Sequence, residues 1–205
     1  MQTKAILWDV MDTLVADPFR DAMPGFFGMT LEQMLREKHP TAWGTFERGE
    51  LSEEAFLATF FADGRTFDTA GFRACIRSSY RWIEGIEALL SALQARGMRM
   101  HTLSNYPEWY AWIEERLQLS RYVQWTFVSC HTGLRKPDTA AFRLAAQVLE
   151  HEPGECLFID DRLSNCDGAR SVGMDAIHFE GDVAQLRAEL ERRGVLPAAG
   201  PSGAA

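Results

Sequence analysis

A short apolar run that ends in acidic residues is the feature of this sequence that most constrains its fold. Residues 5–8 read Ala-Ile-Leu-Trp, which predicts a strand buried on both faces of a parallel sheet. Asp9 and Asp12 follow at the carboxyl end of that strand. In open α/β sheets the loops leaving this edge converge on one crevice, where ligands bind. Asp9 is therefore a candidate for chemistry, although an acid in this place also suits a turn or a helix cap.

The composition narrows the class of partner. The chain has 205 residues, 46% of them hydrophobic, enough for one globular core with a small insertion. Its net charge of -8 disfavours nucleic acid and anionic membranes. No apolar run approaches the ~18 residues of a membrane span, and Lys4 stands directly before the first strand, without a signal-peptide pattern. We therefore expect a cytoplasmic protein with a small-molecule ligand; the sequence does not indicate its oligomeric state.

Strands and helices alternate from residue 83 onward. Strands are predicted over 98–103, 125–128, 156–159 and 176–179, with helices over 86–96, from 107, up to 150, up to 172 and from 182. This alternation predicts a Rossmann-like α/β fold, a parallel sheet with helices on both faces. The sheet domain comprises residues 1–15 and 83–196, and the Ala-, Gly-, Pro- and Ser-rich tail 197–205 is expected to be disordered.

Residues 16–82 differ in character and predict a small helical bundle inserted into the sheet domain. They carry prolines, many aromatics and apolar residues at helical spacing, such as Leu31, Met34 and Leu35. Ser52, followed by two glutamates, is a good helix start. We call residues 16–82 the helical insertion.

Polar residues also follow three other predicted strands, at the same edge of the sheet. They are Ser104 with Asn105, then Lys136, then Asp160 with Asp161. Each has a structural alternative, because serine, asparagine and aspartate cap helices and form turns, and a loop lysine is usually solvated. Their order along the chain, however, is consistent with a single catalytic site built from all of them.

This set of side chains is suited to bind and transfer a phosphoryl group. Asp9, Asp160 and Asp161 would repel one another unless a cation offset their charge, and Mg²⁺ prefers such oxygen ligands. Lys136 adds a positive charge and Ser104 a hydrogen-bond donor, the groups that stabilise a transferring phosphoryl group. With an ordinary pKa of about 3.9, Asp9 would be ionised at neutral pH and able to attack phosphorus.

The residues 9–13, Ser104, Lys136 and Asp160-Asp161 resemble the four ordered motifs of the haloacid dehalogenase superfamily. The helical insertion resembles its subfamily I cap. The resemblance implies a Mg²⁺-dependent phosphatase acting on a small phosphorylated metabolite through an aspartyl-phosphate on Asp9. It implies that Ser104 and Lys136 contact the phosphoryl group. The metal ligands would be Asp9, the Met11 carbonyl, Asp160 and Asp161. The residues that contact the substrate would be Thr13, Asn105 and Asn165. Asn165 fits a DDxxxN variant of the fourth motif, although an exposed helix-start amide is an equal alternative.

Met11 departs from this pattern. Active phosphatases of the superfamily usually have a second aspartate at this position, which protonates the leaving alcohol. A thioether carries no such proton, and general acid–base help contributes about 10²- to 10⁴-fold. Our hypothesis is that Asp12, a metal-bound water or the substrate itself replaces it.

Two alternatives remain open. Leu-Ser-Asn at 103–105 resembles the metal-independent 2-haloacid dehalogenases, which also lack the acid, but those enzymes have no use for Asp160-Asp161. A catalytically weak phosphate-binding or interaction protein would have little reason to keep Asp9, Lys136 and both metal acids.

A closer likeness is to the plant chloroplast flavin mononucleotide (FMN) hydrolase group, which also has methionine at the general-acid position. It implies FMN as a substrate and rests on six segments: VMDTLVADPF (10–19), FFGM (26–29), KHPTAW (38–43), SNYPEWY (104–110), WTFVSC (125–130) and RKPD (135–138). Phe26, Phe27 and Trp43 are candidates to stack on a flavin ring, although aromatics in a small bundle are mostly core.

Overall fold

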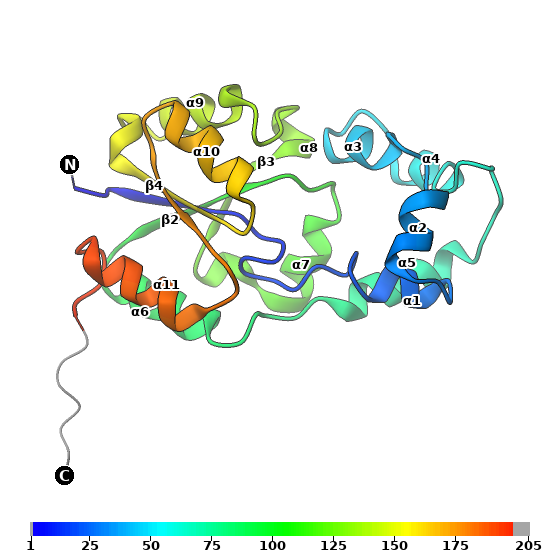
Figure 1. Ribbon diagram of the computed structural model, residues 1–205, viewed down its shortest axis with the longest axis horizontal. Helices are drawn as coiled ribbons and strands as arrows, with labels where there is room; N and C mark the ends of the chain where they lie inside the picture. The colour runs from blue at the N-terminus through cyan, green and yellow to red at the C-terminus, as the bar shows by residue number, and fades with distance from the viewer. Residues whose placement is uncertain (1, 199–205) are drawn as a thin grey trace, which may run out of the picture.

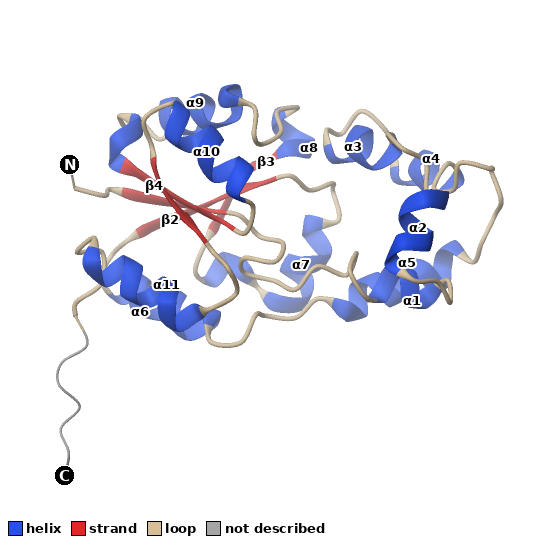
Figure 2. Cartoon of the chain, in the orientation of Figure 1, coloured by secondary structure: helices blue, strands red, loops and turns tan. Residues whose placement is uncertain are grey.

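The protein is an α/β structure built on a parallel sheet, as predicted (Figure 1 and Figure 2). The computed structural model describes residues 2–198, so most of the predicted disordered tail lies outside the described residues. Within them the sheet has five parallel strands in the order β3-β2-β1-β4-β5. Their bounds are β1 Ala5–Trp8, β2 Arg99–Ser104, β3 Gln124–Val128, β4 Cys156–Asp160 and β5 Asp175–His178.

The central strand β1 is buried on both faces, which explains its continuous apolar run. Ile6 and Trp8 belong to the core that contains α6 (Ile86–Ala95) and α11 (Val183–Arg192). Ala5 and Leu7 belong to the opposite core, with α9 (Thr139–Val148) and α10 (Leu163–Ser171). Figure 2 shows the two helix layers on either side of the strands. Within residues 2–198 no helix is both long and apolar enough to cross a bilayer.

Most element boundaries agree with the sequence pattern, and the exceptions have local causes. Gly97, at a φ of +72°, follows the end of α6, and the Ser52 hydroxyl caps α4 (Glu53–Ala58) by accepting from the Ala55 amide. The helix expected from Pro107 begins instead with α7 (Tyr110–Leu117), because residues 107–109 form a turn in which the Tyr110 amide donates to the Pro107 carbonyl.

The helical insertion contains α1 to α5 and lies beyond the carboxyl ends of the strands (Figure 1). An aromatic cluster packs its interior: the Phe27 ring lies 4.9–5.3 Å, centroid to centroid, from those of Phe60, Phe61, Phe67 and Phe72. Its division from the sheet as a separate domain stays a prediction. The helices are α1 Ala22–Phe26, α2 Leu31–Glu37, α3 Ala42–Glu47, α4 Glu53–Ala58 and α5 Thr69–Ser79.

Gly49, just after α3, lies against the short helix α8 (Ser129–Thr132) of the sheet domain. Its φ is +72°, and a β-carbon there would lie 2.4 Å from the Cys130 carbonyl oxygen. We expect Gly49→Ala to reduce the free energy of unfolding in urea by about 2–4 kcal/mol, from backbone strain plus overpacking. Gly64→Ala is the control, because Gly64 has a φ of +73° and open space around it. It should lose about 1 kcal/mol; equal losses would rule out the steric contact as the cause.

Candidate active site

Three buried charged side chains form the centre of the site at the carboxyl edge of the sheet. Asp9 directly follows β1, and its amide donates to the Ile159 carbonyl of β4. The Lys136 ammonium lies 2.6 Å from Asp9 Oδ1 and 2.7 Å from Asp160 Oδ2. Sequence positions up to 151 residues apart therefore meet around one ammonium group, as the strand order predicts.

Asp160 is the last residue of β4 and has no exposed surface. Its Oδ1 accepts from the Arg162 amide at 2.7 Å, and the Asn165 side-chain amide donates to both of its oxygens. Together with Lys136, these donors occupy the carboxylate. In this arrangement Asp160 orients the Lys136 ammonium, and Asn165 orients Asp160.

Thr13 links the first and fourth motifs. Its buried hydroxyl donates to Asp9 Oδ2 at 3.3 Å and accepts from the Asp161 amide at 3.1 Å. The hydroxyl is thus committed to protein groups and supports Asp9 rather than lining the pocket. Its assignment as a substrate contact stays a prediction.

Ser104, the last residue of β2, and Asn105, which follows it, have different environments. The Ser104 hydroxyl is buried and has no hydrogen-bond partner within residues 2–198, which is uncommon for a buried hydroxyl and leaves it available to a ligand. Asn105 Oδ1 accepts from the Lys136 amide at 2.8 Å, and its Nδ2 donates to the Lys136 carbonyl at 2.9 Å. Asn105 therefore clamps the backbone of Lys136.

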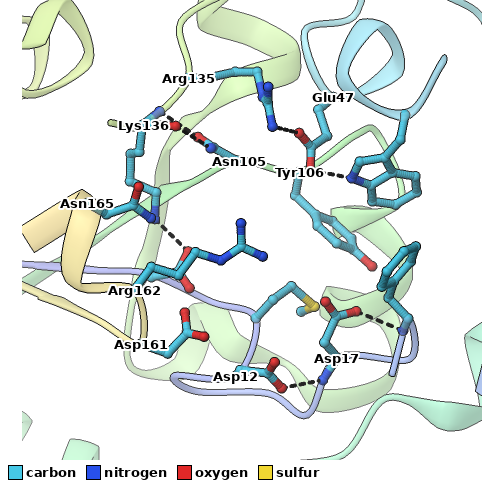
Figure 3. A pocket seen from close by; sticks show the side chains of 14 residues that line it. Asp12, Asp17, Glu47, Asn105, Tyr106, Arg135, Lys136, Asp161, Arg162 and Asn165 are labelled. Atoms are coloured by element: carbon cyan, nitrogen blue, oxygen red, sulfur yellow. Dashed lines mark hydrogen bonds and ion pairs between the residues drawn. The ribbon is translucent and has the colours of Figure 1, made fainter. Parts of the chain in front are cut away.

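A pocket of about 150 Å³ opens beside these residues (Figure 3). Six of the predicted site residues line it: Asp9, Met11, Asn105, Lys136, Asp161 and Asn165. The other three, Ser104, Thr13 and Asp160, are buried and do not line it. Asp12 and Trp43, considered from the sequence as a substitute proton donor and as a flavin-stacking residue, also line it. Six further lining residues were not predicted: Asp17, Phe19, Glu47, Tyr106, Arg135 and Arg162. Adjacency was the available signal for Arg135 and Arg162, which directly follow or precede predicted site residues.

The electrostatics of the site favour a cation. Oxygens of Asp9, Asp160 and Asp161 lie within 4.8 Å of one another. Burial raises the pKa of Asp9 to about 7 against the opposing Lys136 ammonium, and burial together with Asp160 raises the pKa of Asp161. Burial alone would lower the pKa of Lys136, yet Asp160 and Asp9 raise it above its ordinary value. One ammonium therefore contacts two of three crowded carboxylates, and the three carboxylates together are a donor set that fits Mg²⁺.

Asp12 is held within its own loop. It has a φ of +55°, one carboxylate oxygen accepts from the Asp17 amide at 3.1 Å, and the other pairs with Arg20. Both oxygens are therefore occupied, and this geometry gives no support to Asp12 as the substitute for a proton donor at Met11.

The helical insertion supplies one wall of the pocket. Glu47, at the end of α3, is buried and pairs with Arg135 at 2.6 Å. The Trp43 indole also donates to Glu47, and the Glu47 carbonyl accepts from the Ser129 hydroxyl of α8. Burial raises the pKa of Glu47, with Arg135 opposing the rise. These contacts join the insertion to the residue next to Lys136.

Known proteins match most of the chain. A family model described as haloacid dehalogenase-like hydrolase matches residues 3–173. The chain is 46% identical over 175 residues to the chloroplast flavin mononucleotide hydrolase 1 of Arabidopsis thaliana, covering 85% of this chain and 71% of that protein. It is 27% identical over 153 residues to a sesquiterpene phosphatase of Aspergillus oryzae, covering 69% and 74%.

A solved structure agrees with the fold. The magnesium complex of a HAD family enzyme of Bacteroides thetaiotaomicron has a TM-score of 0.76 and 19% identity, covering 91% of this chain and 99% of that one. The family model covers all four motifs, and the predicted superfamily resemblance is therefore confirmed. The chain belongs to the haloacid dehalogenase-like hydrolase family.

Proposed function

We propose that this hydrolase is a Mg²⁺-dependent phosphatase of small phosphomonoesters, with FMN as the first candidate substrate. The observation that carries the proposal is the buried contact of Lys136 with Asp9 and Asp160, beside Asp161. This arrangement provides a nucleophilic carboxylate, a fixed positive charge and a place for a divalent cation.

Each of these residues has a separate role in the proposed reaction. Asp9 attacks phosphorus and forms an aspartyl-phosphate, which water then hydrolyses. Lys136 offsets charge on the phosphoryl oxygens, and the orphaned Ser104 hydroxyl donates to one of them. Asp160, with Asn165 behind it, keeps the ammonium in position.

Asp9, Asp161 and the Met11 carbonyl would hold the Mg²⁺, with Asp160 beside them. When bound, the ion offsets the charge of the phosphoryl group and of the carboxylates around it. The paired acids Asp160 and Asp161 support phosphate chemistry over a metal-independent dehalogenase, which would not need both.

The support for FMN comes from the 46% identity to a flavin mononucleotide hydrolase. Pockets that enclose drug-sized ligands are about 300–1,000 Å³, whereas this pocket of about 150 Å³ accommodates a phosphoryl group and the adjoining part of an ester. Trp43 and Phe19, whose ring centroids lie 6.4 Å apart, line it and are the aromatic side chains best placed to contact the rest of the substrate. Phe26 and Phe27 pack in the aromatic cluster instead.

Phosphate release with and without Mg²⁺ tests the proposal. We expect release from FMN or another phosphorylated metabolite, and from p-nitrophenyl phosphate, to fall at least about a hundredfold with excess chelator and to return when Mg²⁺ is restored, since such an ion contributes several kcal/mol to the barrier. Turnover unaffected by chelator would contradict the metal assignment. Halide release from a 2-haloacid without phosphatase activity would favour the dehalogenase alternative.

A further inference from the structure

We propose that Asp17 performs the proton transfers that Met11 cannot, as donor to the leaving alcohol and acceptor from the attacking water. This inference rests on the proposed phosphatase function and names a catalytic residue outside the four motifs. The chemistry requires a carboxyl group that reaches the pocket, has an unoccupied oxygen and can hold a proton near neutral pH.

Asp17 meets the positional requirement. It lines the same pocket as Asp9 and Lys136, and Figure 3 shows its side chain across the pocket from Asp161 and Asn165. Its Oδ1 accepts from the Phe19 amide at 2.9 Å, which fixes the orientation of the carboxyl group. Its Oδ2 accepts no hydrogen bond from residues 2–198 and is thus available to a substrate oxygen or a water.

The surroundings of Asp17 raise the pKa of its carboxyl group toward neutrality. Burial raises its pKa to about 6, the Phe19 amide opposes the rise, and the neighbouring Asp12 adds to it. Arg162, at the start of α10, and Arg20 lower the pKa without cancelling the effect of burial. A general acid works best with a pKa near the working pH, and this value is closer to neutrality than an exposed aspartate provides.

Two tyrosines complete the charged and titratable groups that face Asp17. The hydroxyls of Tyr80 and Tyr106 lie 2.9 Å apart and are buried. Burial raises the pKa of both phenols, and for Tyr80 the hydrogen bond with Tyr106 opposes the rise without cancelling it. Both therefore stay neutral through the working pH range, and they neither compete with Asp17 for a proton nor repel its carboxylate.

The other acids that line the pocket are committed elsewhere. Both oxygens of Asp12 are occupied by Arg20 and the Asp17 amide. Glu47 pairs with Arg135 and Trp43. Asp161 lies among the proposed metal ligands. Among the pocket acids of residues 2–198 that are neither the proposed nucleophile nor proposed metal ligands, Asp17 is the one that combines a raised pKa with an oxygen free of hydrogen bonds.

The proton balance closes over one cycle. As an Asp9 oxygen bonds to phosphorus, the bond from phosphorus to the ester oxygen breaks, and that oxygen takes the proton of the Asp17 carboxyl. The products are an alcohol, the aspartyl-phosphate and an Asp17 carboxylate. Water then attacks phosphorus while Asp17 takes its proton, and the bond from phosphorus to Asp9 breaks. Inorganic phosphate leaves, and both aspartates return to their starting states.

Asp17→Asn tests the proposal, because it keeps the shape and the acceptor for the Phe19 amide but removes the proton. With FMN, whose leaving alkoxide is strongly basic, we expect kcat/KM to fall about 10²- to 10⁴-fold. With p-nitrophenyl phosphate, whose leaving group needs no proton, the first-turnover release of nitrophenol should change less than about tenfold. Hydrolysis of the intermediate still loses its base, so a phosphorylated protein should accumulate and appear in the intact mass.

The pH profile separates proton transfer from a structural role. Because the donor must be protonated, kcat/KM for the alkyl ester should contain a limb that falls as pH rises through about 6. Asp17→Asn should lose this limb, whereas Asp17→Glu should retain it with part of the activity. Asp21→Asn is the matched control: Asp21 is an exposed acid that caps α1 from the same loop, and asparagine caps equally well. It should leave both substrates and the limb unchanged.

The outcomes are distinguishable from failure of the proposed function. Turnover of p-nitrophenyl phosphate that Asp9→Asn removes would establish the phosphatase irrespective of Asp17. In that case, equal losses on both esters at the first step, or no loss on FMN, would overturn the assignment of Asp17. If the wild-type protein turns over neither ester, both proposals fail.

Discussion

Asp9→Asn is expected to lower phosphate-ester turnover at least about a thousandfold, as loss of a catalytic nucleophile does in other enzymes. The amide oxygen that replaces the carboxylate is a poor nucleophile, while its size still suits the contacts with Lys136 and Thr13. Steady-state phosphate release measures the loss. Acid quenching of the wild-type protein during turnover, followed by peptide mass analysis, should locate one phosphoryl group on the segment that contains Asp9, and the variant should show none.

Asp21→Asn again provides the control, because it is the same chemical change on an exposed acid outside the pocket. Residual turnover above about a tenth of the wild-type rate would exclude Asp9 as the nucleophile. Phosphate binding by both proteins, with turnover by neither, would instead support the phosphate-binding alternative.

Lys136→Met should lower the free energy of unfolding by about 3–5 kcal/mol in urea at pH 8, the second large effect. The substitution leaves Asp9 and Asp160, both buried, without the ammonium that they share. Activity should also be lost, because the positive charge no longer faces the phosphoryl group. Lys4→Met is the control, since Lys4 forms an ion pair with Glu155 at 2.6 Å but is 54% exposed. It should cost about 0–1 kcal/mol.

The pH dependence of this loss follows from the pKa of Asp9. Burial raises it and Lys136 opposes the rise, so removal of the ammonium raises it further. A carboxyl whose folded-state pKa lies above its unfolded value of about 3.9 favours folding when protonated, and that contribution is lost as pH rises through the folded pKa. Lys136→Met should therefore be less destabilising near pH 5.5 than at pH 8. A pH-independent loss equal to that of Lys4→Met would show that the buried pair contributes nothing to stability.

The sheet and the centre of the site were predictable because they depend on local patterns. The apolar run of β1 needs burial on both faces, and strand–helix alternation permits few topologies, so Asp9 and Asp160 had to come to one edge. Lys136 lies in the loop region after β3, and the same reasoning predicted that it would reach this edge. Side-chain partners were not predictable, since nothing in the sequence shows that Asp160 hydrogen-bonds Asn165 and a backbone amide.

The pocket wall contributed by the helical insertion could not be predicted for a different reason. Glu47 and Arg135 are 88 positions apart, and their pairing depends on how α3 sits against α8, a packing outcome with no periodic signal. Trp43 has the same aromatic character as Phe26 and Phe27, yet Trp43 lines the pocket while the two phenylalanines pack in the aromatic cluster. Asp17 stands in a loop where an aspartate is an ordinary turn residue.

Arg135 and Lys136 are consecutive, yet one binds Glu47 of the insertion and the other binds Asp9 of the sheet. Two consecutive residues thus connect the helical insertion and the sheet domain beside the pocket. Because Asn105 anchors the peptide of Lys136 on the sheet side, the Arg135–Glu47 ion pair is one contact between the insertion and the sheet domain that could break without displacing Lys136. A shift of the insertion that widened the pocket would therefore break this ion pair while leaving the contact between Asp9 and the Lys136 ammonium in place.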